Sequence, residues 1–289
     1  AEKRNVNEMP VVFAEAVTAP RLAELDTAFH AQADAWNSGC QSIEPWRGAF
    51  NDASDAWARM EMFASGPLVR QSRRERIAYW PDPRNAVTRG ISALMQGEGQ
   101  SGLSPQDIED ASVAVQGLPA LERLLFSQSE QGGNTDALSE RACAVGRAIA
   151  RNLSAIVSGA LTEWKAPQTG DLDKLRAGTA TKGAADAATS AVLGDLVTGL
   201  RILDDRKVPP LYGGKGVLPN EKKAESWRSH RSERDLLMNI ESLQAALDVL
   251  RPFAPEATVA ANEKLAAAAA ALQGKEDQNR GVTVIAAIN

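Results

Sequence analysis

The sequence predicts an all-α protein, and three observations support this. Apolar residues recur at three- and four-residue steps through most of the chain, which is the spacing of one face of an α-helix. Segments rich in proline and glycine separate these stretches. Strand patterns are scarce, since only Val282 to Ile285 resembles an extended segment. The 44% hydrophobic and 24% charged residues are the composition of a folded globular chain.

The predicted helices follow one another along the chain. Pro20 opens the first, because proline fits the first turn of a helix, and Gly39 marks its end. Shorter helices are expected to start at Pro45 and near Ser226. Four longer amphipathic stretches are also predicted to be helical: Ala142 to Trp164, Ala185 to Leu203, Leu236 to Leu250 and Asn262 to Gln273.

Loops are predicted where helix breakers cluster. The segments are Pro81 to Pro83, Gly97 to Gly102, Gln131 to Asn134 and Val208 to Pro219. The last is expected to be a long irregular insert, and long ordered loops in compact domains are more often functional than merely connecting.

The length of 289 residues exceeds that of a usual single compact domain. Two similar segments, Pro45-Trp46-Arg47-Gly48 and Ser226-Trp227-Arg228-Ser229, suggest an internal duplication. We therefore predict two helical bundles, residues 1–168 and 169–289, with a cleft between them.

Several function classes are disfavoured. The net charge of -5 argues against nucleic acid as the main partner, because binding phosphates needs a basic face. No apolar run approaches the roughly 18 residues that span a bilayer. No P-loop, no GxSxG and no HExxH is present.

The two cysteines, Cys40 and Cys143, leave two interpretations open. They are either buried free thiols or one long-range disulfide, and the absence of CxxC excludes a zinc ribbon or a thioredoxin-like site.

Three segments carry a resemblance to a known family. They are Gln116 to Phe126, Tyr79-Trp80-Pro81-Asp82, and Ser226 to Ser232. In this order they resemble the imelysin family, whose signature has a glycine, a histidine two positions on and a glutamate three further on. Gly117 and Glu122 match that signature, but Pro119 stands at the histidine position.

The resemblance implies an all-helical, two-bundle protein that is exported to the periplasm and associated with iron uptake. It leaves open whether the precursor carries a lipid anchor. Ala1 in place of Met fits either a removed export signal or a trimmed chain. The family was named for a proposed peptidase activity. An exported protein would also favour the disulfide.

The expected ligand site lies in the cleft between the bundles. Glu122 would accept a hydrogen bond or bind a cation such as iron or another divalent metal, tryptophans would wall the site, and arginines would hold an anion or pair with acids. The alternative for Glu122 is a carboxylate in a helix's first turn, stabilised by the helix dipole. The expected cleft residues are Trp46, Arg47, Trp80, Asp82, Glu122, Trp227, Arg228 and Ser229.

A complete metal-peptidase site is not expected. Such chemistry needs about three protein ligands, and Pro119 has no ligand atom. The only histidines are His30, four residues before Asp34, and His230, three before Glu233.

A run of arginines precedes Tyr79. It is either a solvated helix face or an anion site, for instance for a carboxylate or a haem propionate. Its members are Arg70, Arg73, Arg74 and Arg76.

We therefore predict a non-enzymatic periplasmic binding or accessory protein of imelysin type. The alternatives are a metal-dependent peptidase and a helical adaptor that docks a membrane or redox partner.

Overall fold

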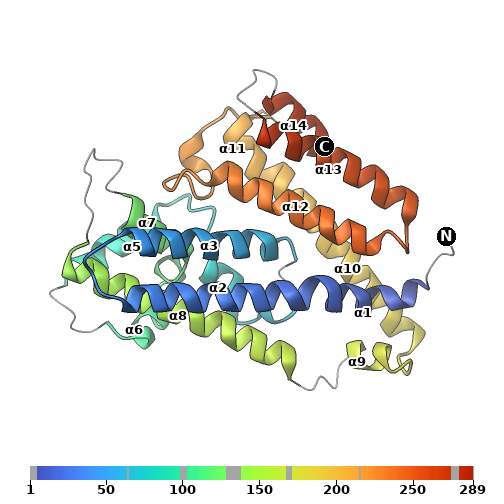
Figure 1. Ribbon diagram of the computed structural model, residues 1–289, viewed down its shortest axis with the longest axis horizontal. Helices are drawn as coiled ribbons and strands as arrows, with labels where there is room; N and C mark the ends of the chain where they lie inside the picture. Colours follow the sequence, from blue (N-terminus) through green and yellow to red (C-terminus); the bar gives the residue numbers. More distant parts are fainter. Residues whose placement is uncertain are drawn as a thin grey trace.

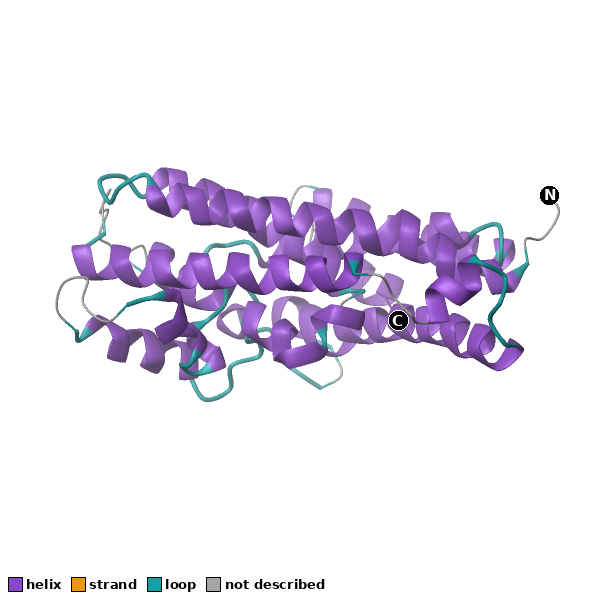
Figure 2. Cartoon of the chain, turned by 90° about the horizontal axis from the view of Figure 1, so that it is seen from below, coloured by secondary structure: helices purple, strands orange, loops and turns teal. Residues whose placement is uncertain are grey.

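The computed structural model describes residues 5–63, 65–97, 103–127, 138–166, 171–214, 216–274 and 280–288. Helices make up most of these residues, and none of them belongs to a strand (Figures 1 and 2). The all-α prediction is therefore confirmed. The loops expected at Gln131 to Asn134 and over most of Gly97 to Gly102 lie outside the described residues.

The α-helices are α1 (Met9–Phe13), α2 (Ala19–Asn37), α3 (Glu44–Glu61), α4 (Arg73–Ile77), α5 (Ala86–Met95), α6 (Pro105–Glu109), α7 (Leu118–Phe126), α8 (Glu140–Lys165), α9 (Asp171–Arg176), α10 (Lys182–Ile202), α11 (Val208–Tyr212), α12 (Ser232–Leu250), α13 (Pro255–Gln273) and α14 (Arg280–Ile288).

Two hydrophobic cores organise these helices. The first surrounds α8, which packs along α2 and against α7, while α3 packs against α2 and α7. The second is built from α10, α12, α13 and α14, and it also takes in Met9, Phe13 and Val17 from the start of the chain. Helices α3 and α12 pack against each other and link the two cores (Figure 1). The boundary near residue 168 stays a prediction.

The first long helix begins earlier than Pro20. Helix α1 continues through a π-helical turn, Ala14–Thr18, directly into α2. Proline has no backbone N–H to donate within a helix, and the wider turn just before Pro20 is one way in which a helix accommodates a proline. Pro20 therefore lies in the first turn of α2 without interrupting the path of the chain.

The segment from Val208 was predicted to be an irregular loop, and its first part is helical instead. A second π-helical turn, Leu203–Lys207, joins α10 to α11, and Pro209 lies in the first turn of α11. The physical reason is the same, because the first turn is where a missing N–H costs least. The irregular part starts only at Gly213, whose φ is 78°.

The extended segment expected at Val282 to Ile285 is also wrong, because these residues lie in α14. Helix α14 packs against α13 and buries Val284 fully in the second core. Tertiary packing here overrides the preference of β-branched residues for strands.

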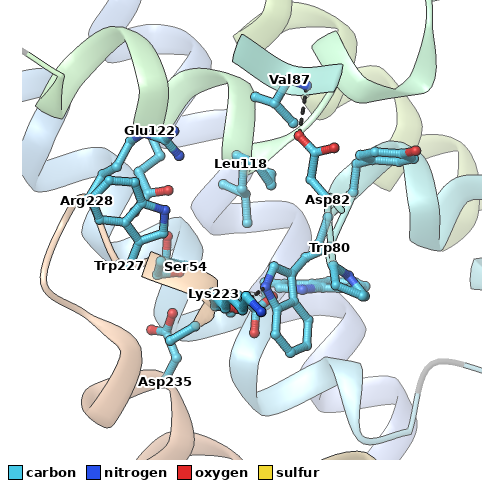
Figure 3. Close-up of a pocket in the computed structure, with 18 of the residues that line it drawn as sticks. Ser54, Trp80, Asp82, Val87, Leu118, Glu122, Lys223, Trp227, Arg228 and Asp235 are labelled. Atoms are coloured by element: carbon cyan, nitrogen blue, oxygen red, sulfur yellow. Dashed lines mark hydrogen bonds between the residues drawn. The ribbon is translucent and has the colours of Figure 1, made fainter. Parts of the chain in front are cut away.

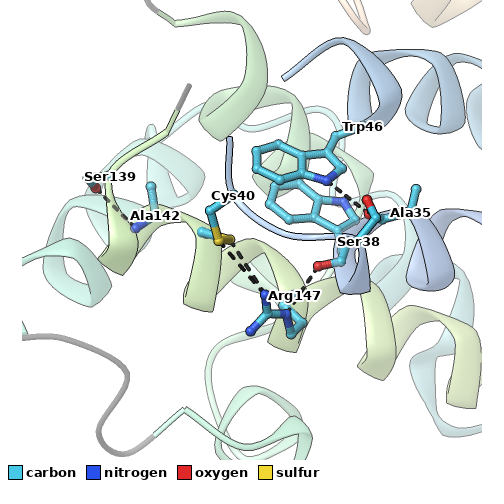
Figure 4. The surroundings of a disulfide bond; sticks show 9 residues. Ala35, Ser38, Cys40, Trp46, Ser139, Ala142 and Arg147 are labelled. Atoms are coloured by element: carbon cyan, nitrogen blue, oxygen red, sulfur yellow. Dashed lines mark hydrogen bonds between the residues drawn. A yellow bond between two sulfur atoms is a disulfide. The ribbon is translucent and has the colours of Figure 1, made fainter. Parts of the chain in front are cut away.

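Cys40 and Cys143 form a disulfide with their Cα atoms 5.9 Å apart (Figure 4). It ties the loop between α2 and α3 to α8. Next to it, Trp36 and Trp46 stack with ring centroids 4.6 Å apart. Gly146 of α8 permits this arrangement, because a Cβ there would lie 2.2 Å from the Trp36 ring.

The arginines that precede Tyr79 tie elements together. Arg70 and Arg73 both pair with Glu163 of α8, and Arg74 donates to the Glu61 carbonyl oxygen at 2.8 Å. Arg76 donates to Gln116 Oε1 at 2.7 Å. Their partners lie within the protein, so they form neither a purely solvated face nor an open anion site.

No helix among the described residues is long and apolar enough to cross a membrane.

Candidate functional site

A cavity of about 600 Å³ lies where α3, the segment before α5, the start of α7 and the segment before α12 meet (Figure 3). Aromatic and proline side chains form much of its wall. The aromatic lining residues are Phe50, Trp57, Tyr79, Trp80 and Trp227. The acidic lining residues are Glu61, Asp82, Glu122, Glu225 and Asp235.

Glu122 connects two of these segments. Its side chain is buried, and its Oε1 accepts hydrogen bonds from the backbone N–H of Ser229 at 2.9 Å and from Ser229 Oγ at 2.7 Å. Burial raises the pKa of Glu122, and the bonds from Ser229 partly offset that rise. Glu122 lies in the second turn of α7, so the expected first-turn position is wrong.

The other two signature positions shape the start of α7. Gly117 is the residue before the helix, and a Cβ there would lie 2.4 Å from the carbonyl oxygen of Ile77. Glycine therefore allows the last turn of α4 to pass close to the start of α7. Pro119 lies in the first turn, as the helix-start interpretation predicts, and it also lines the cavity.

The Tyr79 to Asp82 segment forms the opposite wall. Trp80 Nε1 donates to the Lys223 carbonyl oxygen at 3.3 Å, which holds the two segments together. Asp82 accepts from the backbone N–H groups of Ala86 at 2.8 Å and Val87 at 2.9 Å, so it caps the start of α5. In Figure 3, Trp80 and Asp82 face the cavity from the side opposite Glu122 and Trp227.

The Ser226 to Ser229 segment is a turn and not the helix start that the sequence suggested. Ser226 and His230 both have positive φ, and α12 begins only at Ser232. Within the turn, the Arg228 guanidinium lies 4.4 Å from the centre of the Trp227 ring. The turn places Ser229 against Glu122. It also places Trp227 in the cavity wall.

A buried charged group lies at the inner end of the cavity. Lys207 pairs with Glu61 and, at 2.6 Å, with Glu225, and it also donates to Asn239 Oδ1 at 2.9 Å. Burial and the Glu61 charge raise the pKa of Glu225 to about 7. Burial alone would lower the pKa of Lys207, but Glu225 and Glu61 outweigh it and raise that pKa.

Asp235 belongs to the same group. Burial raises its pKa to about 6, against the opposing effect of Arg231 at 3.4 Å. Arg231 also pairs with Asp55 of α3.

Sequence reasoning missed these charged residues. A partial signal was available for α3, where Ser54, Trp57 and Glu61 recur at three- and four-residue steps and so share one helix face. The pairing with Lys207 and Glu225 had no signal in the sequence pattern, because it joins segments far apart in the chain.

Three expected cleft residues do not line the cavity: Ser229, which instead holds Glu122, and Trp46 and Arg47 of α3. Trp46 is fully buried in the first core, stacked on Trp36, and its Nε1 donates to the Ala35 carbonyl oxygen at 3.0 Å. Arg47 donates to the Leu125 carbonyl oxygen at 3.0 Å and lies over the Phe126 ring. Both fasten the start of α3 to its neighbours, so their place at a helix start reflects packing.

The residues present do not fit a metal ion at the signature position. Pro119 offers no ligand atom, and Glu122 is already held by Ser229. His30 lies between Ser154 and Ser158, 3.6 Å from Asp26, and His230 is exposed beside Glu221. Within the described residues, no group of three or more His, Cys, Asp or Glu side chains could hold a metal ion.

Comparison with known proteins decides the family. The family model described as Imelysin matches residues 12–279, which is most of the chain. The chain belongs to the imelysin family.

Solved structures show the same imelysin fold. An imelysin-like protein from Psychrobacter arcticum 273-4 is similar with a TM-score of 0.81 and 18% identity, over 100% of this chain and 93% of that one. A protein from Parabacteroides distasonis ATCC 8503, described as an iron-regulated protein A precursor, gives a TM-score of 0.74 and 14% identity over the same shares. No curated protein matched the sequence.

Proposed function

We propose that this imelysin protein is an exported, periplasmic binding or accessory protein of iron uptake, and that it binds its ligand without turning it over. The observation that carries the proposal is the cavity of about 600 Å³ closed on one side by the Glu122–Ser229 contact. A cavity of this size with apolar walls and a few convergent polar groups is typical of small-molecule sites.

The residues have distinct proposed roles. Trp80 and Trp227 pack against the ligand, and Arg228, which lines the cavity beside Trp227, takes part in ligand binding. Glu122, Ser229 and Asp82 are positioning residues, because their oxygen atoms are engaged in holding the Ser226 to Ser229 turn and the start of α5. The ligand therefore meets a wall whose shape is fixed before binding.

The link to iron rests on one relative and on the family resemblance. The structural neighbour from Parabacteroides distasonis is described as iron-regulated, and the shared fold covers 100% of this chain and 93% of that one. An accessory protein of an iron transporter has to bind its ligand and dock to the transporter, and neither task needs a catalytic group.

The test is uptake of radiolabelled iron by the source organism after deletion of the gene. We expect uptake under iron limitation to fall and to be restored by the wild-type gene. The cavity-blocking variant Ala78→Phe should fail to restore it, because Ala78 lines the cavity. Ala266→Phe, an exposed position on α13, is the matched control and should restore it.

Unchanged uptake in the deletion strain would contradict the proposal. Chelator-sensitive peptide hydrolysis by the purified protein, lost in Glu122→Gln, would replace it with the peptidase alternative.

A further inference from the structure

The inner end of the cavity carries more carboxylates than cations. Lys207 is shared between Glu61 and Glu225, so above pH 7, where Glu225 is ionised, two negative groups meet one positive group. Arg228 is the cation that faces Glu122. The charges around Asp235 balance, since Arg231 and Arg234 are matched by Asp55 and Asp235.

The lysines at the cavity rim do not cancel this excess. Lys222 and Lys223 line the cavity, but both are exposed to solvent, where water and salt screen their charges. The Glu61–Lys207–Glu225 group is buried, so its excess negative charge acts on the cavity at much closer range. The cavity is thus electrostatically suited to a positive group.

Two buried polar atoms on the α3 face of the cavity have no hydrogen-bond partner among the described residues. They are Ser54 Oγ and Trp57 Nε1, in side chains that are only 4% and 3% exposed. Buried polar groups in folded proteins are nearly always hydrogen-bonded, because a buried donor or acceptor without a partner costs free energy. The Ser54 hydroxyl can accept a bond from a positively charged group, whereas the Trp57 N–H can donate only to an acceptor atom elsewhere on a ligand.

The walls match the same kind of ligand. Trp57 and Trp80 line the cavity, and the faces of aromatic rings attract organic cations. The chain already uses this attraction here, where Arg228 and Lys222 both lie over the Trp227 ring.

We propose that the cavity binds a small organic cation, an amine or a guanidinium with an apolar body. The positive end pairs with Glu61 and Glu225 and donates to Ser54 Oγ, while the body packs between Trp57 and Trp80. This inference rests on the proposed function and names the ligand class of the same cavity. A metal ion is a poorer fit, since the described residues offer no group of three ligands.

The test compares three molecules of similar shape by calorimetric titration of the full chain at pH 8. They are 2-phenylethylamine, the neutral 2-phenylethanol and the anion phenylacetate. We expect the amine to bind one to one and about tenfold or more tightly than the alcohol, because a hydrogen-bonded charge contact adds at least that much. Phenylacetate should not bind.

Two variants locate the positive end. Glu225→Gln keeps the shape of the side chain and removes its charge, and it should weaken amine binding about tenfold while leaving alcohol binding unchanged. Ser54→Ala should weaken amine binding to a smaller degree. Glu221→Gln, an exposed position, is the matched control and should change nothing. Circular dichroism establishes that each variant is folded.

Equal binding of the amine and the alcohol, preferential binding of phenylacetate, or no binding of any of the three would overturn the inference. So would amine binding that persists in Ala78→Phe. None of these outcomes decides the proposed function, which stands or falls on the iron-uptake measurement.

Discussion

At the scale of single residues, Glu122 is the point where the signature segment of α7 meets the turn before α12. It lies 107 positions from Ser229, yet the two side chains are hydrogen-bonded in the interior. The signature glutamate of this chain therefore joins two distant segments. Its hydrogen-bond partner is Ser229, whereas a metal site would need further ligand side chains around Glu122.

We predict that Glu122→Ala lowers the free energy of unfolding by about 1–3 kcal/mol, because it leaves the buried N–H and hydroxyl of Ser229 without an acceptor. Glu122→Gln keeps an acceptor oxygen and should cost less. Urea unfolding at pH 7 measures both. A Glu122→Ala protein as stable as the wild type would show that the contact does not hold the turn.

The sequence predicted part of the residues that share the cavity. Trp80, Asp82, Glu122, Trp227 and Arg228 line it, and Ser229 holds Glu122 in place. These residues lie in short motifs with recognisable neighbours.

The site residues that the sequence misassigned or missed have two different explanations. Trp46 and Arg47 shared the same motif type but serve packing. Glu61, Lys207 and Glu225 could not be predicted, because each resembles an ordinary charged residue until the fold brings the three together.

At the scale of elements, periodicity predicted the long helices well. Helix α8 spans Glu140–Lys165 where Ala142 to Trp164 was expected, and α12 ends at Leu250 just before Pro252. Besides the helical Val282 to Ile285 segment and the turn at Ser226, the errors concern helix ends. Proline normally marks a break, but π-helical turns before Pro20 and Pro209 let the chain continue as a helix. Local sequence does not reveal such turns.

The disulfide acts at this scale, since it fixes the α2–α3 loop against α8. Replacing both Cys40 and Cys143 with alanine should lower the free energy of unfolding by about 2–5 kcal/mol, because the bridge closes a long loop in the unfolded chain. The bridge spans 103 positions. Reductant should destabilise the wild type by a similar amount and leave the double variant unchanged. A wild type insensitive to reductant would contradict this prediction.

At the scale of the whole molecule, two cores share a charged seam where α3 meets α12. Glu61 and Asp55 of α3 face Asp235 of α12 and Arg231 just before that helix, with Lys207 and Glu225 beside them. The cavity opens along this seam, so the same residues affect both stability and ligand binding.

The buried acids of the seam predict a pH dependence of stability. The pKa of Glu225 is raised from 4.5 to about 7, with Glu61, Lys207 and Asp235 as the charged groups that face it. The folded state therefore holds a proton that the unfolded state has lost, and stability falls as the pH rises from 4.5 to 7. Asp235, with a pKa of about 6, adds to the same trend.

Glu225→Gln should flatten this decline, because the variant has no proton to lose at that position. Thermal unfolding at several pH values between 4.5 and 7.5 measures the slope for both proteins, with Glu221→Gln as the exposed control. If stability declines with pH equally steeply in Glu225→Gln and in the wild type, the raised pKa of Glu225 is contradicted.

The central claim is that the signature segment here supports a cavity for an organic ligand and not a metal centre. The most direct measurement is metal content followed by calorimetric titration with iron, zinc and calcium, on the wild type and on Glu122→Ala. We predict no stoichiometric binding by either protein. One equivalent of metal bound by the wild type and lost in Glu122→Ala would contradict the claim and restore Glu122 as a ligand.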